Sequence, residues 1–293
     1  MNKDEVMETE EFLCRSVLYV PGSKPRSLEK CLTLAADVII LDLEDSVLPS
    51  EKVSARRAIC EFLKDAQFGR KKCFVRINDL SSEWGVDDLH VVCSLKIDAV
   101  VVPKVEESNV IKFVSSVLDA KLKDSKIKIW AMIETPLGVV NSLEIAAAPK
   151  MQGFVLGTND LAKELKSRSR KSLGVSLQNC LLSARSHYIM CVDGVYNKFK
   201  DLDGLLLECE EGRDIGFDGK SLLHPAQIPI ANKSFGLSDQ EIKNAKEQIL
   251  AFEKVKSLGQ GVAVLDGKII ENLHVLEAEE VLRKELRIKA MEN

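Results

Sequence analysis

Short apolar runs alternate with longer amphipathic stretches along most of the chain. The apolar runs predict buried strands at residues 15–20, 37–43, 72–77, 99–103, 127–134, 154–157, 191–195 and 217–223. Between them, helical spacing of apolar residues predicts helices at residues 27–36, 50–63, 85–95, 106–122, 138–148, 174–189, 202–215 and 225–233. Eight strand–helix units in this order are typical of a (β/α)8 TIM barrel, an α/β fold. A doubly wound open sheet is the alternative, but it usually has fewer units and often a glycine-rich first turn.

The pattern changes after the eighth unit. Residues 238–258 predict a long charged helix that starts with a capping box at Ser238. Residues 262–270 predict a small hairpin with an Asp-Gly turn, and a terminal helix follows from about residue 273 to residue 290. This C-terminal part is small, so we expect it to pack on a barrel, its own or a partner's. We therefore divide the chain into an N-terminal extension, a barrel and a C-terminal helical extension, at residues 1–14, 15–236 and 237–293.

Composition narrows the class of partner. The chain has 41 Lys and Arg against 45 Asp and Glu, and it lacks a basic block, so neither nucleic acid nor an anionic membrane is expected as a partner. Eight cysteines without a Cys-x-x-Cys pair suggest buried thiols in a reducing compartment. Residues 1–11 are acidic and resemble neither a secretory signal nor a transit peptide. A cytoplasmic location is expected, and a mitochondrial one would require an alternative N-terminus.

Charged residues gather at the carboxyl ends of the predicted strands. Asp42, Glu44 and Asp45 close the second strand, Arg76 the third, Lys104 follows the fourth, Glu134 ends the fifth and Asp160 follows the sixth. Each has a simpler explanation when taken singly: Asp160 as a helix cap, Glu44 and Asp45 as solvated turn acids, Arg76 as their ion-pair partner. However, a barrel places all of them on the rim where this fold builds active sites, which favours catalysis.

Glu134 and Asp160 are the most informative pair. If their strands are neighbours, the two carboxylates emerge a few ångströms apart and repel unless they are protonated or bridged by a cation. Oxygen ligands of this kind suit a hard divalent ion, and Mg²⁺ is the simplest choice. His224 stands without a second histidine or cysteine at ligand spacing, so we interpret it as a structural residue.

Seven sequence blocks carry a resemblance to a known family. They are RSVLYVPGS (15–23), LDLEDSV (41–47), VRIN (75–78), VPKV (102–105), IETPLG (133–138), GTNDLA (157–162) and GFDGKSLLHPAQI (216–228). In this order they resemble the citrate lyase β-subunit-like proteins, which include malyl-CoA and citramalyl-CoA lyases within the metal-dependent 2-oxo-acid aldolase superfamily. The resemblance extends from about residue 15 to residue 273.

The resemblance implies a Mg²⁺-dependent carbon–carbon lyase and a homotrimer. Its substrate would be (3S)-citramalyl-CoA or malyl-CoA, cleaved to acetyl-CoA and pyruvate or glyoxylate. In reverse, with hydrolysis, the reaction would be that of a malate synthase. Glu134 and Asp160 match the metal ligands, and Arg76 matches the arginine that faces the substrate oxygens. Asp42, Glu44 and Asp45 would then orient metal-bound water or Arg76. Contacts to coenzyme A are implied for Tyr19, Lys24, Arg26, Lys30, Val192 and Asp193.

The sequence departs from the family pattern in two places. Glu271 stands where the family has a catalytic Asp in an Ile-Asp-x-Pro context, contributed by a neighbouring subunit, and Asp266 is the fallback for this role. The connection before Cys191 is about eight residues shorter than in relatives, or about 12 Å of helix, which predicts either a strained link to the seventh strand or a locally broken barrel. A catalytically impaired CoA-binding or assembly subunit is therefore the alternative function.

Overall fold

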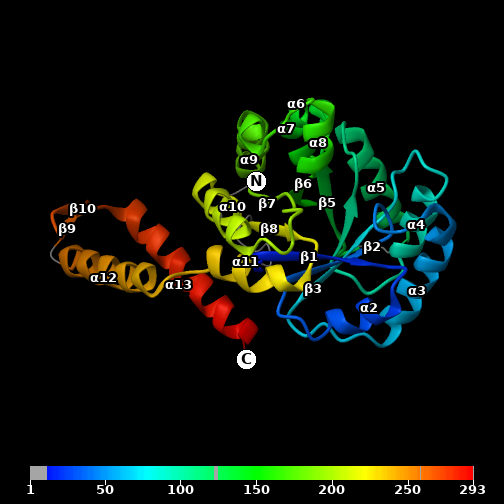
Figure 1. Cartoon of the computed structure of the whole chain (residues 1–293). Helices are drawn as coiled ribbons and strands as arrows, with labels where there is room; N and C mark the ends of the chain where they lie inside the picture. Colours follow the sequence, from blue (N-terminus) through cyan, green and yellow to red (C-terminus); the bar gives the residue numbers. More distant parts are fainter. Residues whose placement is uncertain (1–11, 122–124, 258, 293) are drawn as a thin grey trace. The chain divides into compact units, whose positions relative to one another are not determined.

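The computed structural model describes residues 12–121, 125–257 and 259–292, and its larger unit is a closed barrel of eight parallel strands (Figure 1). The predicted TIM barrel is confirmed, and the open-sheet alternative is wrong because the first strand pairs with the eighth. The strands are β1 (Ser16–Pro21), β2 (Val38–Asp42), β3 (Lys72–Arg76), β4 (Ala99–Val102), β5 (Lys128–Ile133), β6 (Met151–Leu156), β7 (Met190–Asp193) and β8 (Gly219–Leu222).

Helices follow the strands and cover the outside of the barrel (Figure 1). They are α2 (Pro25–Cys31), α3 (Lys52–Asp65), α4 (Gly85–Val92), α5 (Ser108–Lys121), α6 (Pro136–Val140), α7 (Ser142–Ala146), α8 (Thr158–Glu164), α9 (Gly174–Ser186), α10 (Leu202–Ile215) and α11 (Ile228–Ser234), with 3-10 turns η1 (Pro49–Glu51), η2 (Arg170–Leu173) and η3 (Pro225–Gln227). One predicted helix is split into α6 and α7, and α8 was not predicted because seven residues are too few to show a helical period.

Successive side chains of a strand point to opposite faces, and this alternation separates the apolar core from the site. On β5, Ile129 and Ile133 belong to the apolar core that also contains residues from the surrounding helices. Trp130, Met132 and Glu134 fall on the opposite face, which points into the barrel. The Trp130 ring packs 5.2 Å from the phenylalanine ring of β3. Aromatic rings therefore fill the middle of the barrel interior, and charged side chains line its carboxyl end.

The connection between α9 and β7, which the resemblance predicts to be short, leaves the barrel intact. Helix α9 ends at Ser186, and β7 pairs with both β6 and β8, so the prediction of a locally broken barrel is wrong. Tyr188 bridges the short link with φ of 56°, a left-handed conformation that side chains with a Cβ adopt at a cost of about 1–2 kcal/mol. Arg185 offsets this strain by donating to the Ile189 carbonyl and to both carboxylate oxygens of Asp218.

The described part of residues 236–292 belongs to a second compact unit. Helix α12 (Asp239–Lys256) starts with the predicted capping box, in which Ser238 and the glutamate three residues later each bind the other's backbone N–H. The hairpin β9 (Ala263–Leu265) and β10 (Lys268–Ile270) turns at an Asp-Gly pair, whose two φ values are 48° and 75°. Helix α13 (Asn272–Glu292) follows. In the described part of the chain, no helix has both the length and the apolar character that crossing a membrane requires.

Candidate active site at the carboxyl end of the barrel

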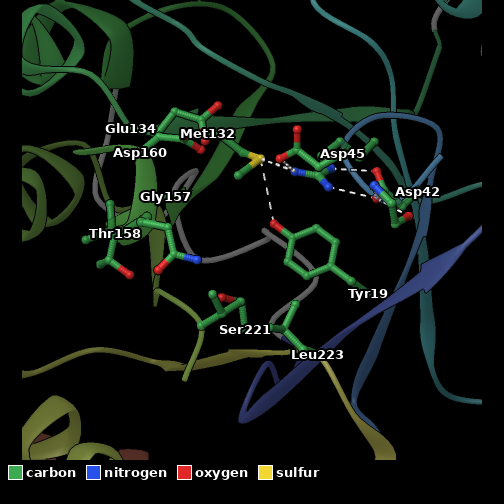
Figure 2. Close-up of a pocket in the computed structure, with 15 residues that line it drawn as sticks. Tyr19, Asp42, Asp45, Met132, Glu134, Gly157, Thr158, Asp160, Ser221 and Leu223 are labelled. Atoms are coloured by element: carbon green, nitrogen blue, oxygen red, sulfur yellow. Dashed lines mark hydrogen bonds and ion pairs between the residues drawn. The ribbon is translucent and has the colours of Figure 1, made fainter. Parts of the chain in front are cut away.

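A cavity of about 300 Å³ lies at the carboxyl end of the barrel strands (Figure 2). Its volume suits a small organic acid and is too small for a complete coenzyme A. Six residues predicted from the sequence line it, namely Tyr19, Asp42, Asp45, Arg76, Glu134 and Asp160. Met132, Thr158, Asn159 and Ser221 also line it and were not predicted. For Met132 a signal was present, because it stands two residues before Glu134 and so shares its face of the strand.

Glu134 directly follows β5 and is 2% exposed. Its Oε1 accepts a hydrogen bond of 2.7 Å from the backbone N–H of Lys104. Gly157 makes room for the carboxylate, because a Cβ at this position would collide with the Glu134 side chain. Asp160, in the first turn of α8, is half-buried and reaches the same cavity beside Glu134 (Figure 2). The predicted pair therefore shares one cavity.

The carboxylates place excess negative charge in a buried space. Burial raises the pKa of Glu134 to about 7; the charges of Glu44 and Asp160 add to this, while the Lys104 N–H and Arg76 oppose it. A buried carboxylate of this kind is stabilised by a proton or by a cation. Among the described residues, no group of three or more His, Cys, Asp or Glu side chains is arranged to hold a metal. Two carboxylates nevertheless fit Mg²⁺, because this ion commonly takes one or two protein carboxylates and completes its shell with water or substrate oxygens.

Magnesium binding is therefore expected to weaken as the pH falls through 7. Below this pH Glu134 is mostly protonated, and a proton must leave before the carboxylate can bind a cation. With one proton released, the dissociation constant for Mg²⁺ should be about tenfold higher at pH 6 than at pH 8. Calorimetric titration of the protein with MgCl₂ at these two pH values measures the ratio. Equal affinities would contradict the assignment of Glu134 as a ligand.

Arg76, at the end of β3, is fixed by acids from β2 and its following loop. Asp42 lies opposite it in register and accepts two hydrogen bonds, of 2.6 Å from Nε and 2.7 Å from Nη2. Burial would raise the pKa of Asp42, but the Arg76 guanidinium and several hydrogen bonds hold it below its usual range. Glu44 Oε2 lies 2.8 Å from Arg76 Nη1 without making a hydrogen bond, and the exposed Asp45 lies 3.4 Å from the same atom. Asp42 and Glu44 thus orient Arg76 more tightly than Asp45 does.

Lys104 contacts both Glu134, of the predicted metal pair, and Glu44, beside Arg76. The sequence indicates only that Lys104 lies on the rim. Its backbone adopts φ of 51°, in the left-handed region, and presents its N–H to Glu134. Its Nζ lies 3.2 Å from Glu44 Oε1. Lys104 therefore positions one acid through its backbone and the other through its side chain.

Two substitutions at Lys104 are expected to separate these contributions. Lys104→Gly removes the amine but adopts positive φ readily, so the N–H to Glu134 should stay in place. Lys104→Ala also removes the amine and must hold a left-handed conformation with a Cβ, so it should be about 1 kcal/mol less stable than the glycine variant. Urea denaturation of both variants measures this difference. An alanine variant as stable as the glycine variant would show that the backbone geometry is not under this strain.

The residues implied as coenzyme A contacts fall into different environments. Lys24, Arg26 and Lys30 are exposed on α2 or just before it, and none of them lines the cavity. Tyr19 instead is buried, and its hydroxyl points into the cavity (Figure 2). The binding of coenzyme A by the three basic residues stays a prediction.

Val192 and Asp193 have no exposed surface at all. The Asp193 carboxylate accepts two hydrogen bonds from Arg170 and one of 2.8 Å from the buried Lys220. These cations hold the pKa of Asp193 below its usual range although burial alone would raise it. Asp193 therefore stabilises the end of β7, and the contact of Val192 and Asp193 with coenzyme A stays a prediction.

The remaining candidates lie in the C-terminal unit or have local roles. Glu271 is exposed between β10 and α13, and its N–H donates to His274 Nδ1 at 3.1 Å. Its role as acid or base stays a prediction. Asp266 occupies the hairpin turn with positive φ, which is a turn position. His224 caps η3 by accepting from the Ala226 N–H, which confirms its structural interpretation.

Comparisons with known proteins agree with the seven sequence blocks. Residues 15–225 match the family model described as HpcH/HpaI aldolase/citrate lyase. A (3S)-malyl-CoA thioesterase of Cereibacter sphaeroides is 50% identical over 279 residues, which cover 94% of this chain and 96% of that protein. An L-malyl-CoA/beta-methylmalyl-CoA lyase of Rhodobacter capsulatus is 32% identical over 301 residues, covering 93% of this chain and 94% of that one.

A solved structure is similar over most of its length. The protein CitE from Mycobacterium tuberculosis, in complex with magnesium, acetoacetate and coenzyme A, has a TM-score of 0.75 and 27% sequence identity to this chain. The match covers 92% of this chain and 97% of that one. From the family model and these relatives, we conclude that the chain belongs to the HpcH/HpaI aldolase/citrate lyase family.

Proposed function

We propose that this chain, an acyl-CoA-acting enzyme, is a Mg²⁺-dependent lyase for thioesters of the malyl-CoA type. Such substrates carry a hydroxyl and a free carboxylate on one carbon, two bonds away from the thioester carbonyl. The products would be acetyl-CoA and a 2-oxo acid such as glyoxylate or pyruvate. The observation that carries the proposal is one cavity of small-acid size lined by Glu134, Asp160 and Arg76.

Each group has a role that follows from its position. Glu134 and Asp160 would hold Mg²⁺, which when bound makes the substrate hydroxyl more acidic. When a water molecule accepts the proton of that hydroxyl, the O–H electron pair forms the new C=O of the 2-oxo acid and the adjacent carbon–carbon bond breaks. The pair from the broken bond moves to the thioester oxygen as an enolate, where the buried Arg76 offsets its charge. A proton delivered to the enolate carbon completes acetyl-CoA, and Glu271 is the candidate donor.

Hydrolysis is the second candidate, because a relative at 50% identity is named a malyl-CoA thioesterase. In hydrolysis, water attacks the thioester carbonyl, the carbon–sulfur bond breaks, and coenzyme A leaves as a thiol. Among the described residues that line the cavity there is neither a histidine nor a cysteine. The hydroxyls of Ser46, Thr158 and Ser221 also line the cavity, but no histidine of this lining is there to activate them, which favours water over a side chain as the nucleophile.

Product analysis distinguishes the two reactions. The purified full-length protein is incubated with Mg²⁺ and (3S)-malyl-CoA or (3S)-citramalyl-CoA, and the products are separated chromatographically while free thiol is measured. Lyase activity gives equal amounts of acetyl-CoA and 2-oxo acid with no new thiol, whereas hydrolysis gives free thiol and the hydroxy acid. Turnover of neither substrate, with coenzyme A still bound, would overturn the proposal and favour a CoA-binding or assembly subunit.

A further inference from the structure

Tyr19 brings a second hydrogen-bond donor to the cavity beside Arg76. Its side chain is 9% exposed, and the centroid of its ring lies 4.6 Å from the Arg76 guanidinium carbon. The hydroxyl points into the cavity, toward Met132 (Figure 2). Burial raises the pKa of Tyr19 above that of an ordinary tyrosine, so the hydroxyl keeps its proton at physiological pH. It is therefore available as a neutral donor.

The hydroxyl and the guanidinium converge on a single weak acceptor. Tyr19 Oη donates to Met132 Sδ at 3.7 Å, and Arg76 Nη1 donates to the same sulfur at 3.6 Å (Figure 2). A thioether is a poor acceptor, so both donors lose little when they turn to an oxygen. The methionine side chain is flexible and can yield this position to a ligand.

Asp42 fixes the Arg76 guanidinium, and the guanidinium in turn fixes the ring of Tyr19. Asp42 holds Nε and Nη2 of Arg76, which leaves Nη1 as the nitrogen directed toward Met132. Nη1 also donates to Asp45 at 3.4 Å and lies 2.8 Å from Glu44 Oε2, and these two acids help to fix its position. The Tyr19 hydroxyl is held by the stacking of its ring on the guanidinium. Two preorganised donors thus meet at one point, which is the geometry of an oxyanion site.

We propose that Tyr19 Oη and Arg76 Nη1 together bind the thioester carbonyl oxygen, and that Tyr19 is a further catalytic residue. The inference rests on the proposed function, and it applies to both candidate reactions. In carbon–carbon cleavage, the oxygen receives negative charge as the electron pair of the broken bond forms the enolate. In hydrolysis, it receives the π pair of the carbonyl as water adds to the carbon. Tyr19 thus acts at the reacting end of the substrate, whereas the family resemblance implied only a contact to coenzyme A.

Tyr19→Phe tests this role, because it removes the hydroxyl and keeps the ring on Arg76. Loss of one oxyanion donor lowers kcat by about 10²- to 10³-fold, and KM should change by less than about threefold because the hydrogen bond strengthens only in the transition state. Tyr188→Phe is the matched control: Tyr188 is exposed and lies outside the cavity lining, so its kcat should equal that of the wild type. The melting temperature and Mg²⁺ affinity of Tyr19→Phe should also be unchanged.

The outcomes separate this inference from the proposed function. If the wild-type protein turns over neither thioester, the proposed function fails. If the wild type is active and Tyr19→Phe keeps kcat within about threefold, the role of Tyr19 is overturned. A rise in KM with unchanged kcat would likewise overturn it, since the hydroxyl would then only bind the ground state. If Tyr19→Phe does not fold, Tyr19→Met, which fills the space without a donor, replaces it in the same measurement.

Discussion

Glu134→Gln is expected to abolish turnover while making the metal-free protein more stable at pH 8. The amide keeps the shape of the side chain and can still accept the Lys104 N–H, but it lacks the charge that holds a cation. A bound metal contributes several kcal/mol to charge stabilisation in the transition state, so kcat should fall by about 10³-fold or more. Steady-state assays with malyl-CoA and calorimetric Mg²⁺ titration measure both losses. Unchanged activity would show that the metal site is misassigned.

The gain in stability follows from the raised pKa of Glu134. Burial raises this pKa from 4.5 to about 7, so the folded protein holds the proton more tightly than the unfolded chain does. The stabilising effect is complete below about pH 4.5 and is lost as the pH rises through 7. Above that pH, ionisation of the buried group costs about 3 kcal/mol, which glutamine avoids. Urea denaturation without metal should show this gain at pH 8 and about 1 kcal/mol or less at pH 5.

The matched control for this prediction is Glu107→Gln. Glu107 is an exposed acid of the same barrel and lies outside the cavity lining. Its substitution should change neither kcat nor the difference in stability between pH 8 and pH 5. A pH-dependent gain of the same size in this control would mean that the effect of Glu134→Gln arises from net charge and not from burial.

The barrel could be predicted because its strands are buried on both faces. Such strands form nearly continuous apolar runs, and each ends where polar residues begin, so the apolar pattern alone places the ends of β2, β3 and β5 to within one residue. The same boundaries mark the rim, so the sequence predicts that Glu134 and Asp160 lie close together, and both line one cavity. Short helices such as α8 gave no comparable signal.

The contacts within the site depend on interactions that sequence spacing does not encode. Lys104 adopts a left-handed backbone, a conformation that nothing in a lysine predicts. The Asp193 carboxylate is bound by Arg170, 23 residues away, and by Lys220, two partners that no sequence spacing indicates. The convergence of Tyr19 and Arg76 on Met132 arises from three separate strands meeting across the barrel interior. Tertiary packing sets each of these features, and no local sequence pattern predicts them.

Arg76→Met is expected to destabilise the protein as well as inactivate it. The substitution fills much of the same volume but leaves Asp42, which is 0% exposed, without its cation, and Glu44 keeps only its ion pair with Lys104. Removing one partner of a buried ion pair costs about 3–5 kcal/mol, because the remaining charge is neither solvated nor paired. Urea denaturation at pH 7.5 measures this loss. Wild-type stability in Arg76→Met would contradict the assignment of a buried, ionised Asp42.

A second substitution separates the structural role of Arg76 from its catalytic one. In Arg76→Met with Asp42→Asn, the unpaired charge at position 42 is removed, so we expect much of the lost stability to return. Activity should not return, because the charge that offsets the anionic oxygen of the substrate is still missing. Recovery of kcat together with stability would instead mean that Arg76 serves only the fold. Tyr19 would then be the only remaining donor of the proposed oxyanion site.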